Sequence, residues 1–390
     1  MSMEYYRFGR VLIPEGGIFD DVESAIEFVQ DVEEGVLLEQ VQHLGFTTDE
    51  EGIMKVLINN KRYNITLSAL KDLCKLLKVP ASYINKFPGR DLVLENLNNN
   101  PYLLENSDTV KLVIWKHPEH PVIAGVLPGS DAGMLMGEYF EMLQDAGVFE
   151  RENCQLDQIA ITGEETVLYF YLPEELTHER FHFNLGYAMH YSPTTAADFT
   201  IYPFTRMTVV STAGEPFDFD FESTVKLHLV KRKKEDFISE LMDLAPNYVG
   251  EDLGAHYEEV VKYGTVSRNV DEIRYALLKY LKSRAVSTYN YGGMKVDGNE
   301  VSQEVIPEHK EFATANQEQL KTDATYATNN LPVSFYLPLY FNRIFTFPAN
   351  IENPAFMIRY RRSVGTALNK ILDEVGDVMV EPRERGKDEG

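Results

Sequence analysis

The stretch TLSALKDLCKLLKVPASYINKF (Thr66–Phe87) predicts two helices joined by a tight turn, because its apolar residues recur at helical spacing. Pro80 stands where the second helix can begin, since the first turn of a helix does not need that residue's N–H. We expect the pair to form an N-terminal helical hairpin that closes the core of this region. The apolar positions are Leu67, Leu70, Leu73, Cys74, Leu77, Val79, Ile84 and Phe87.

Strand patterns lie on both sides of this pair. GIMKVLINNKRYNITL (52–67) alternates around Asn59-Asn60 and predicts a β-hairpin. TVKLVIWKH (109–117), TVLYFYLP (166–173) and FTIYPFTRMTVVSTA (199–213) are rich in β-branched and aromatic residues, which is typical of strands.

Helical patterns are mixed with these strands in no regular order. DDVESAIEFVQDVEEGVLLEQVQHL (20–44) predicts an amphipathic surface helix, and NVDEIRYALLKYLKSR (269–284) predicts another. A last helical region opens at Asn353-Pro354. We expect an α+β fold with a mixed, largely antiparallel sheet and packed helices. The expected parts are an α/β region with the helical hairpin (1–130), a β-rich region with C-terminal helices (131–380) and a disordered tail (381–390).

Composition limits the class of protein. The 390 residues are 44% hydrophobic and 25% charged, as in ordinary globular proteins, and the formal net charge is −24. No apolar run is long enough to cross a bilayer, and the charged start does not fit a signal peptide. The two cysteines suggest free thiols. We expect a cytoplasmic protein, in a host cell if a phage encodes it.

The negative charge is unevenly distributed along the chain. Residues 1–50 carry a local net charge of −10, residues 51–100 carry +4, and each of the next two blocks of fifty carries −6. The basic block contains the helix pair, whose lysines face solvent in the predicted arrangement and suit contacts with a phosphate backbone. The favoured interpretation of this pair is a purely structural helical hairpin, and phosphate contacts by its lysines are the alternative. The lysines are Lys71, Lys75, Lys78 and Lys86.

The segment LSALKDLCKLLKVPASYINKFPGRDLVLENLN and the segment FNLGYAMHYSPTTAADFTIYPFTRMTVVSTAG together resemble the domain-of-unknown-function 932 family of phage and plasmid proteins. The resemblance covers about Ile53 to Lys234. Ser192 and Arg206 match positions of the family pattern. Tyr191 stands where the family has an asparagine, and Val209 stands near the position of the family's cysteine. The resemblance implies a mobile-element origin and a mixed α/β fold, and it implies no activity.

One predicted strand combines aromatic rings with an arginine. Alternation places Tyr202, Phe204 and Arg206 on one side, an arrangement that suits stacking on unpaired bases. The alternative is a core strand whose arginine pairs with a carboxylate such as Asp198 or Glu222. Further phosphate contacts are expected from a downstream basic run, which otherwise is a solvated charge run. That run is Lys231, Arg232, Lys233 and Lys234.

Metal chemistry has two weak signals. His178, Glu179 and His182 match H-E-x-x-H, in which helical histidines bind zinc and the glutamate acts as the base. The motif requires a helix over PEELTHERF (173–181) and a third ligand, His190 or Glu215. The carboxylates Asp218, Asp220 and Glu222 alternate on one strand face and suit a divalent cation, or form the wet face of an edge strand. We favour no metal site and no cofactor.

Three functional hypotheses remain. The first is a phage or plasmid accessory protein that binds nucleic acid, with single strands as the expected form, in replication, recombination or host takeover. The second is an acidic interaction or inhibitor module that docks on a basic host protein which handles nucleic acid. The third is a zinc-dependent enzyme at the H-E-x-x-H stretch. The sequence favours a binding protein over an enzyme, and a homo-oligomer is compatible with it.

Overall fold

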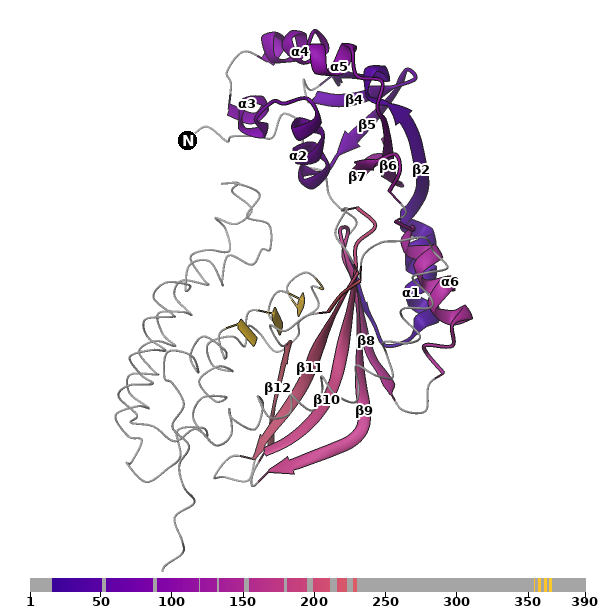
Figure 1. Cartoon of the computed structure of the whole chain (residues 1–390), viewed down its shortest axis with the longest axis vertical. Coiled ribbons are helices and arrows are strands. Elements are labelled where there is room, and N and C mark those ends of the chain that lie inside the picture. Colours follow the sequence, from indigo (N-terminus) through magenta and orange to yellow (C-terminus); the bar gives the residue numbers. More distant parts are fainter. Residues whose placement is uncertain are drawn as a thin grey trace, which may run out of the picture.

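The fold contains two β-sheets and two groups of helices (Figure 1). It was obtained as a computed structural model. The structure describes residues 16–50, 54–86, 90–118, 120–131, 133–150, 154–178, 181–194, 199–210, 216–222 and 227–229, and seven residues between Pro354 and Thr366. Within these residues the α+β class is confirmed, and both sheets are mostly antiparallel.

The first sheet has six strands in the order β2-β6-β7-β5-β4-β3, and only β5 and β7 pair in parallel. Asn59 and Asn60 adopt positive φ angles of 48° and 66° in the turn between β4 and β5, which confirms the predicted hairpin. The strands are β2 (Glu33–Gln40), β3 (Leu44–Thr48), β4 (Met54–Ile58), β5 (Lys61–Ile65), β6 (Thr109–Trp115) and β7 (Val122–Pro128).

Four helices pack against this sheet: α2 (Leu67–Leu76), α3 (Ala81–Lys86), α4 (Arg90–Asn98) and α5 (Pro101–Leu104). Thr66 begins α2 by accepting a hydrogen bond from the N–H of Ala69. The apolar side of α2 then joins strand residues in a buried cluster with Val56 and Leu112. The first described element of the chain is a strand, and α2 and α3 follow five strands, so an N-terminal helical hairpin is not shown as the opening unit.

The second sheet has seven strands in the order β1-β8-β9-β10-β11-β12, and β13 also pairs with β11. All of its pairings are antiparallel. The strands are β1 (Gly17–Phe19), β8 (Gln155–Ile161), β9 (Thr166–His178), β10 (Phe181–Tyr191), β11 (Phe199–Val210), β12 (Pro216–Glu222) and β13 (Leu227–Leu229).

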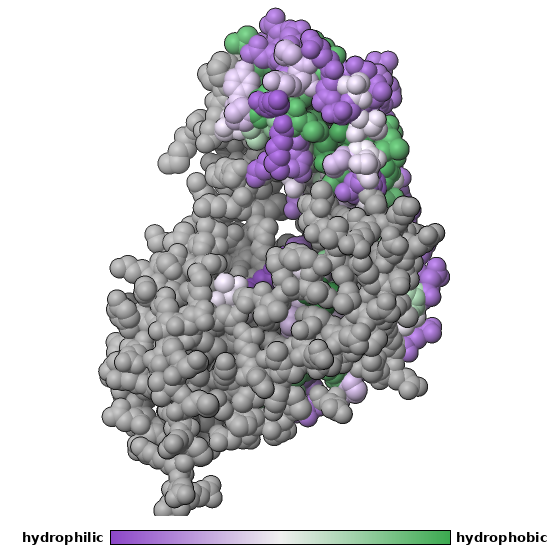
Figure 2. Space-filling model, viewed as in Figure 1, coloured by the Kyte–Doolittle hydropathy of each residue, from purple (hydrophilic) through white to green (hydrophobic). Residues whose placement is uncertain are grey.

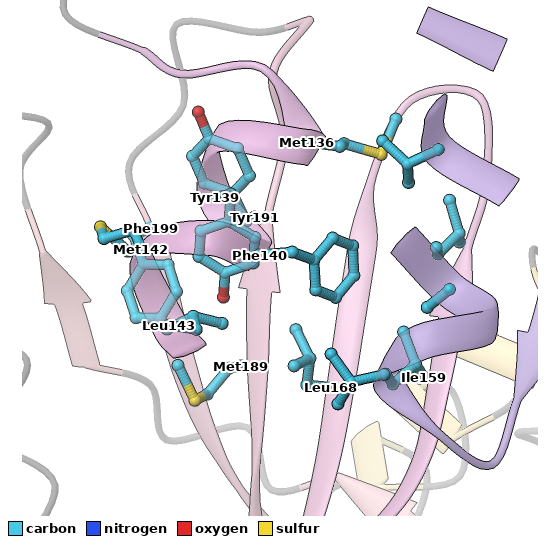
Figure 3. Packing of buried hydrophobic residues seen from close by; sticks show 14 of the residues in the cluster. Met136, Tyr139, Phe140, Met142, Leu143, Ile159, Leu168, Met189, Tyr191 and Phe199 are labelled. Carbon is cyan, nitrogen blue, oxygen red and sulfur yellow. The ribbon is translucent and has the colours of Figure 1, made fainter. Parts of the chain in front are cut away.

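The two remaining helices, α1 (Val22–Val32) and α6 (Met136–Asp145), lie side by side next to the second sheet (Figure 1). Their apolar sides meet one face of that sheet in a shared core (Figure 3). This core also includes Trp115 of the first sheet. Within it, the rings of Tyr139 and Tyr191 stack with their centroids 4.4 Å apart. This shared core therefore joins the two sheets.

Two further contacts fix the same junction. The carboxylate of Glu33 in β2 accepts hydrogen bonds from the N–H groups of Met136 and Gly137, at 2.6 and 3.0 Å, and so caps the N-terminus of α6. Gly125 in β7 lies so close to Thr194 that a Cβ at this position would come within 2.7 Å of the Thr194 backbone. Any side chain at residue 125 would push the two sheets apart.

One sequence prediction for a helix is wrong, and a second helix, which only the zinc motif would require, does not form. The helix predicted over 20–44 ends at Val32, because the backbone of Glu33 is already extended (φ −76°, ψ 131°). Residues 33–40 form β2, in which most side chains alternate between half-buried and exposed, and Gly35 takes a φ of 139° at an irregularity in the pairing with β6. The helix required over 173–181 is absent as well. Its described residues form a hairpin of β9 and β10, in which Thr177 pairs with His182.

Tyr139 and Tyr191 provide a matched test of the core. The hydroxyl of Tyr139 is fully buried and has no hydrogen-bond partner among the described residues, whereas that of Tyr191 accepts from Met134 N–H and donates to Met134 O, both at 2.6 Å. We expect Tyr139→Phe to leave the free energy of unfolding unchanged or raise it by about 1 kcal/mol, and Tyr191→Phe to lower it by about 1–3 kcal/mol. Urea denaturation of both variants checks this, and equal losses would contradict the assigned hydrogen bonds.

Candidate functional site

The C-terminal end of α2 holds a lysine in an unusual backbone conformation. Lys78 has a φ of 52°, the left-handed region that glycine normally occupies at this position. The N–H of Val79 donates to Cys74 O at 3.0 Å, and that of Lys78 to Lys75 O at 3.2 Å, which together make the Schellman arrangement that ends a helix. A non-glycine residue costs about 1–2 kcal/mol in this conformation.

An exposed aromatic ring lies next to this lysine. Asn100 donates to the carbonyl of Leu77 at 3.1 Å and accepts from the N–H of Tyr102 at 2.8 Å, so it ties the end of α2 to the start of α5. This contact brings Lys78 Nζ to 4.2 Å from the centroid of the Tyr102 ring. Tyr102 remains 46% exposed, so its ring is accessible to a ligand.

Lys71 and Lys75 lie one turn apart on the same side of α2, because residues at i and i+4 share one face of a helix, and Lys78 follows directly after the C-terminal end of α2. All three lysines are exposed. Lys75 pairs with Asp72 at 2.7 Å, but its side chain is 78% exposed, so the pair is a weak surface interaction. We call Lys71, Lys75, Lys78 and Tyr102 the cationic surface. In Figure 2 hydrophilic residues dominate the region of α2, α4 and α5.

The other predicted residue of the helix pair is Lys86, whose backbone ends α3 and whose side chain lies outside the described residues. The basic run Lys231, Arg232, Lys233 and Lys234 also lies outside them, as do Glu179, Asp198 and Glu215. Of the expected lysines, the structure therefore describes the side chains of Lys71, Lys75 and Lys78, and it places Lys78 against Tyr102, which the sequence reasoning missed.

The aromatic strand with an arginine is internal. Phe204 is fully buried and Tyr202 is partly buried, so the Phe204 ring is not available to stack on a base, contrary to the sequence prediction. Arg206 donates to both oxygens of Asp220, at 2.9 and 3.2 Å, and to Asp157 at 3.4 Å. The expected alternative of a core strand with a paired arginine fits this arrangement, although the partner is Asp220 and not Asp198 or Glu222.

The carboxylates of β12 likewise belong to an internal layer and not to a wet edge. Glu222 is buried, accepts a hydrogen bond from Tyr169 Oη at 3.0 Å, and has an oxygen 3.2 Å from His190 Nε2. The described C-terminal residues lie beside β11 and β12 (Figure 1), and they bring Arg361 to Asp220 and Arg362 to Glu165. The side chain of Asp218 lies outside the described residues. We call these charged groups the ionic layer, and its members are Asp157, Glu165, His190, Arg206, Asp220, Glu222, Arg361 and Arg362.

Burial and ion pairing oppose each other in this layer. Burial alone would raise the pKa of the Glu165 carboxyl, but His190, whose Nδ1 lies 3.8 Å away, and the charge of Arg362 lower it to about 2. The pKa values of Asp220 and Glu222 are also lowered despite burial, the first by Arg361 and Arg206 and the second by His190 and Arg362. The carboxylates therefore stay ionised because cations face them.

The H-E-x-x-H stretch lacks the geometry of a zinc site. His178 and His182 belong to neighbouring strands of a hairpin and not to one helix, and His182 contacts the carboxylate of Glu175 at 2.6 Å. His190, a suggested third ligand, lies in the ionic layer. Among the residues that the structure describes, no group of three His, Cys, Asp or Glu side chains is placed to hold a metal ion.

No protein-family model, no curated protein and no solved structure matches the chain. The resemblance to the domain-of-unknown-function 932 family therefore stays a prediction from the sequence. No helix in the described part of the chain is both long and apolar enough to cross a membrane.

The ionic layer predicts a dependence of stability on pH. A carboxyl whose pKa falls on folding stabilises the folded state above its unfolded pKa of about 4.3, and this contribution is lost as the pH falls through the folded value. For Glu165 the loss occurs between about pH 4.5 and pH 2, and amounts to on the order of 2 kcal/mol. The raised pKa of Asp157, caused by burial, acts in the opposite direction.

We expect Glu165→Gln to reduce the slope of unfolding free energy against pH over this range, as measured by denaturant titrations at several pH values. Glu175→Gln provides the control, because Glu175 is an exposed carboxylate of the same sheet. Parallel slopes for wild type and Glu165→Gln would show that His190 and Arg362 do not lower the pKa of Glu165 in the folded protein.

Proposed function

We propose that the protein binds nucleic acid, with single strands preferred, through the cationic surface of α2 and α5. The observation that carries this proposal is the geometry of Lys78 and Tyr102. A strained lysine stands where glycine would fit better, and its ammonium group lies over an exposed tyrosine ring. Strain at a residue with no packing role is a reason to look for function there.

The surface supplies the two contacts that a single strand requires. Lys71 and Lys75 lie on one side of α2 and Lys78 follows the end of that helix, and all three are exposed, so they can contact phosphates of a strand. The Tyr102 ring offers a stacking platform, which contributes about 1–3 kcal/mol per base and tolerates any sequence. A duplex presents no unpaired base to this ring, so we expect single strands to bind more tightly.

The remainder of the chain limits the affinity. A formal net charge of −24 repels phosphate at long range, so attraction is confined to the basic region around α2. We expect weak, strongly salt-dependent binding that assists other factors in replication, recombination or host takeover. The resemblance to phage and plasmid proteins supports such an accessory role in the cytoplasm of a host cell.

The strain at Lys78 gives a test that separates binding from folding. We expect Lys78→Gly to keep or raise the free energy of unfolding by up to about 1 kcal/mol, because glycine adopts the left-handed conformation without strain. The same change should weaken binding of a labelled oligothymidine and lower the slope of log K against log salt by about 0.7, the value for one lost phosphate contact on a single strand.

Two further variants complete this experiment. Tyr102→Leu keeps an apolar side chain but removes the ring, so it should reduce the preference for single over double strands. Lys61→Gln is the matched control: it removes an exposed lysine of β5 that pairs with Glu34, outside the cationic surface. The proposal fails if wild type shows no salt-sensitive binding, or if Lys61→Gln weakens binding as much as Lys78→Gly does.

A second candidate function, docking on a basic host protein, has one specific observation in its favour. The neighbouring helices α1 and α6 both expose carboxylates, and no lysine or arginine occurs in residues 16–54 or 117–150. The exposed residues include Glu23, Glu27, Glu138, Glu141 and Asp145.

Charge reversal tests this alternative. If a basic nucleic-acid-handling protein co-purifies with wild type at low salt, the double variant Glu27→Lys/Glu141→Lys should lose it, because both positions are exposed on the acidic helices. Retention of the same protein by the double variant would place the contact elsewhere.

A further inference from the structure

One face of the seven-stranded sheet combines carboxylates with aromatic rings. Alternation along β9 turns Leu168 and Phe170 toward α1 and α6, and turns Val167, Tyr169 and Tyr171 toward the opposite side. Phe204 and Ala188 join the second group. On this side lie four carboxylates from three places in the chain: Asp157 of β8, Glu165 of the β8–β9 turn, and Asp220 and Glu222 of β12.

Arg361 is buried in one half of this face. Its NH2 group donates to Asp220 at 2.8 Å and to Gln158 at 3.1 Å. Its guanidinium carbon lies 4.1 Å from the centroid of the Tyr169 ring and 4.8 Å from that of Phe204. Only 5% of the side chain is exposed, so the contact excludes water from both the charge and the rings.

Arg362 fills the other half. It donates to Glu165 at 2.9 Å and contacts the ring nitrogen Nδ1 of His190, and its Nε lies 3.4 Å from Glu222. Its guanidinium carbon lies 5.8 Å from the Tyr202 ring. Two adjacent arginines therefore occupy two neighbouring subsites, each made of a carboxylate and an aromatic ring.

The chemistry of these subsites selects guanidinium over ammonium. A guanidinium group is planar, so it can lie on an aromatic ring and still direct its N–H groups sideways to acceptors. Arg361 does this with two rings and two acceptors at the same time. A lysine ammonium is a compact, strongly hydrated charge and cannot satisfy the acceptors and the rings together.

The face also requires cations from outside the sheet. The sheet contributes four carboxylates against Arg206, so it carries a net charge of −3 when His190 is neutral and the C-terminal arginines are absent. Isolated buried charges are costly, and removal of one partner of a buried ion pair typically costs 3–5 kcal/mol. The arginines that fill this need come from a segment 141 to 203 residues away from their partners in sequence.

We propose that this face is a recognition surface for a pair of arginines, which the chain's own Arg361 and Arg362 fill in this structure. When that pair is withdrawn, the surface accepts an arginine pair from another polypeptide. The protein's own segment with Arg361 and Arg362 is then an intramolecular occupant that limits access to the face. This inference does not rest on the proposed binding of nucleic acid, because the cationic surface and this face share no residue.

The test uses the full chain with both arginines replaced, Arg361→Gln/Arg362→Gln, and a labelled peptide that copies residues 353–367. We expect the peptide to bind this variant, and to bind wild type at least tenfold more weakly because the own segment competes. A second peptide with lysine at positions 361 and 362 has the same charge, and should bind the variant at least tenfold more weakly than the arginine peptide. Fluorescence anisotropy measures both affinities.

Equal binding of the two peptides would overturn the proposal, since it would show attraction by charge alone. So would the absence of binding by a variant whose amides in β10 keep the wild-type protection from hydrogen exchange. If the glutamine variant does not fold, Arg361→Lys/Arg362→Lys takes its place, because it keeps both charges.

Wild type supplies an independent readout that needs no variant. An excess of the arginine peptide should increase hydrogen exchange in residues 354–366 and leave exchange in β12 unchanged. The reason is that the peptide takes the place of the protein's own Arg361 and Arg362 on β12. No increase at saturating concentrations of the peptide would contradict the exchange of one arginine pair for another.

Discussion

Both faces of the seven-stranded sheet are buried, and the rest of the structure depends on how each face is covered. Strand side chains alternate, so β9, β10 and β11 each contribute residues to both sides. The face toward α1 and α6 is apolar, and tight packing stabilises it. The opposite face carries four carboxylates, and it is stable only because arginines and a histidine meet them. The sheet therefore joins an apolar interface to an ionic one.

The two interfaces have different consequences for movement. A core such as that around Tyr139 and Phe140 loses its stabilisation when its members separate, because apolar surface returns to water. An ion-pair layer behaves differently, since its charged groups regain hydration when they part and often gain little net stability from pairing. The C-terminal contact adds Met357 and Ile358 to the buried cluster on that face, beside the two arginines. The C-terminal segment is therefore held on this face both by ion pairs and by apolar contacts.

The sequence predicted local structure well where a residue's own chemistry sets the backbone. Asn59-Asn60 tolerates the left-handed conformation and therefore marks its hairpin, and Thr66 marks the start of α2 through its own side chain. The prediction failed where helical and strand patterns overlap. Val22 to Val29 have helical spacing, but the apolar residues after Gly35 are consecutive, and their alternation between exposed and half-buried is visible only in the folded strand.

The candidate sites were harder to predict because their residues meet only through the fold. Arg206 was recognised as an arginine that needs a carboxylate, yet its partner Asp220 is set by the register of β11 and β12. Arg361 and Arg362 lie more than a hundred residues from their partners, so only their position in an apolar helical pattern could have signalled burial. Tyr102 was missed although Asn100-Pro101 marks a helix start, because its contact with Lys78 depends on how α5 is joined to α2.

The distribution of charge connects these observations. In this chain of net charge −24, Arg206, Arg361 and Arg362 lie in the ionic layer, where four carboxylates would otherwise be buried without partners. The exposed cations of the described region that cluster on one helix are lysines, on α2, and their ammonium groups remain hydrated. A basic surface of this kind binds a polyanion through phosphate charge and not through bidentate recognition of bases, so any selectivity must come from the one aromatic ring beside it.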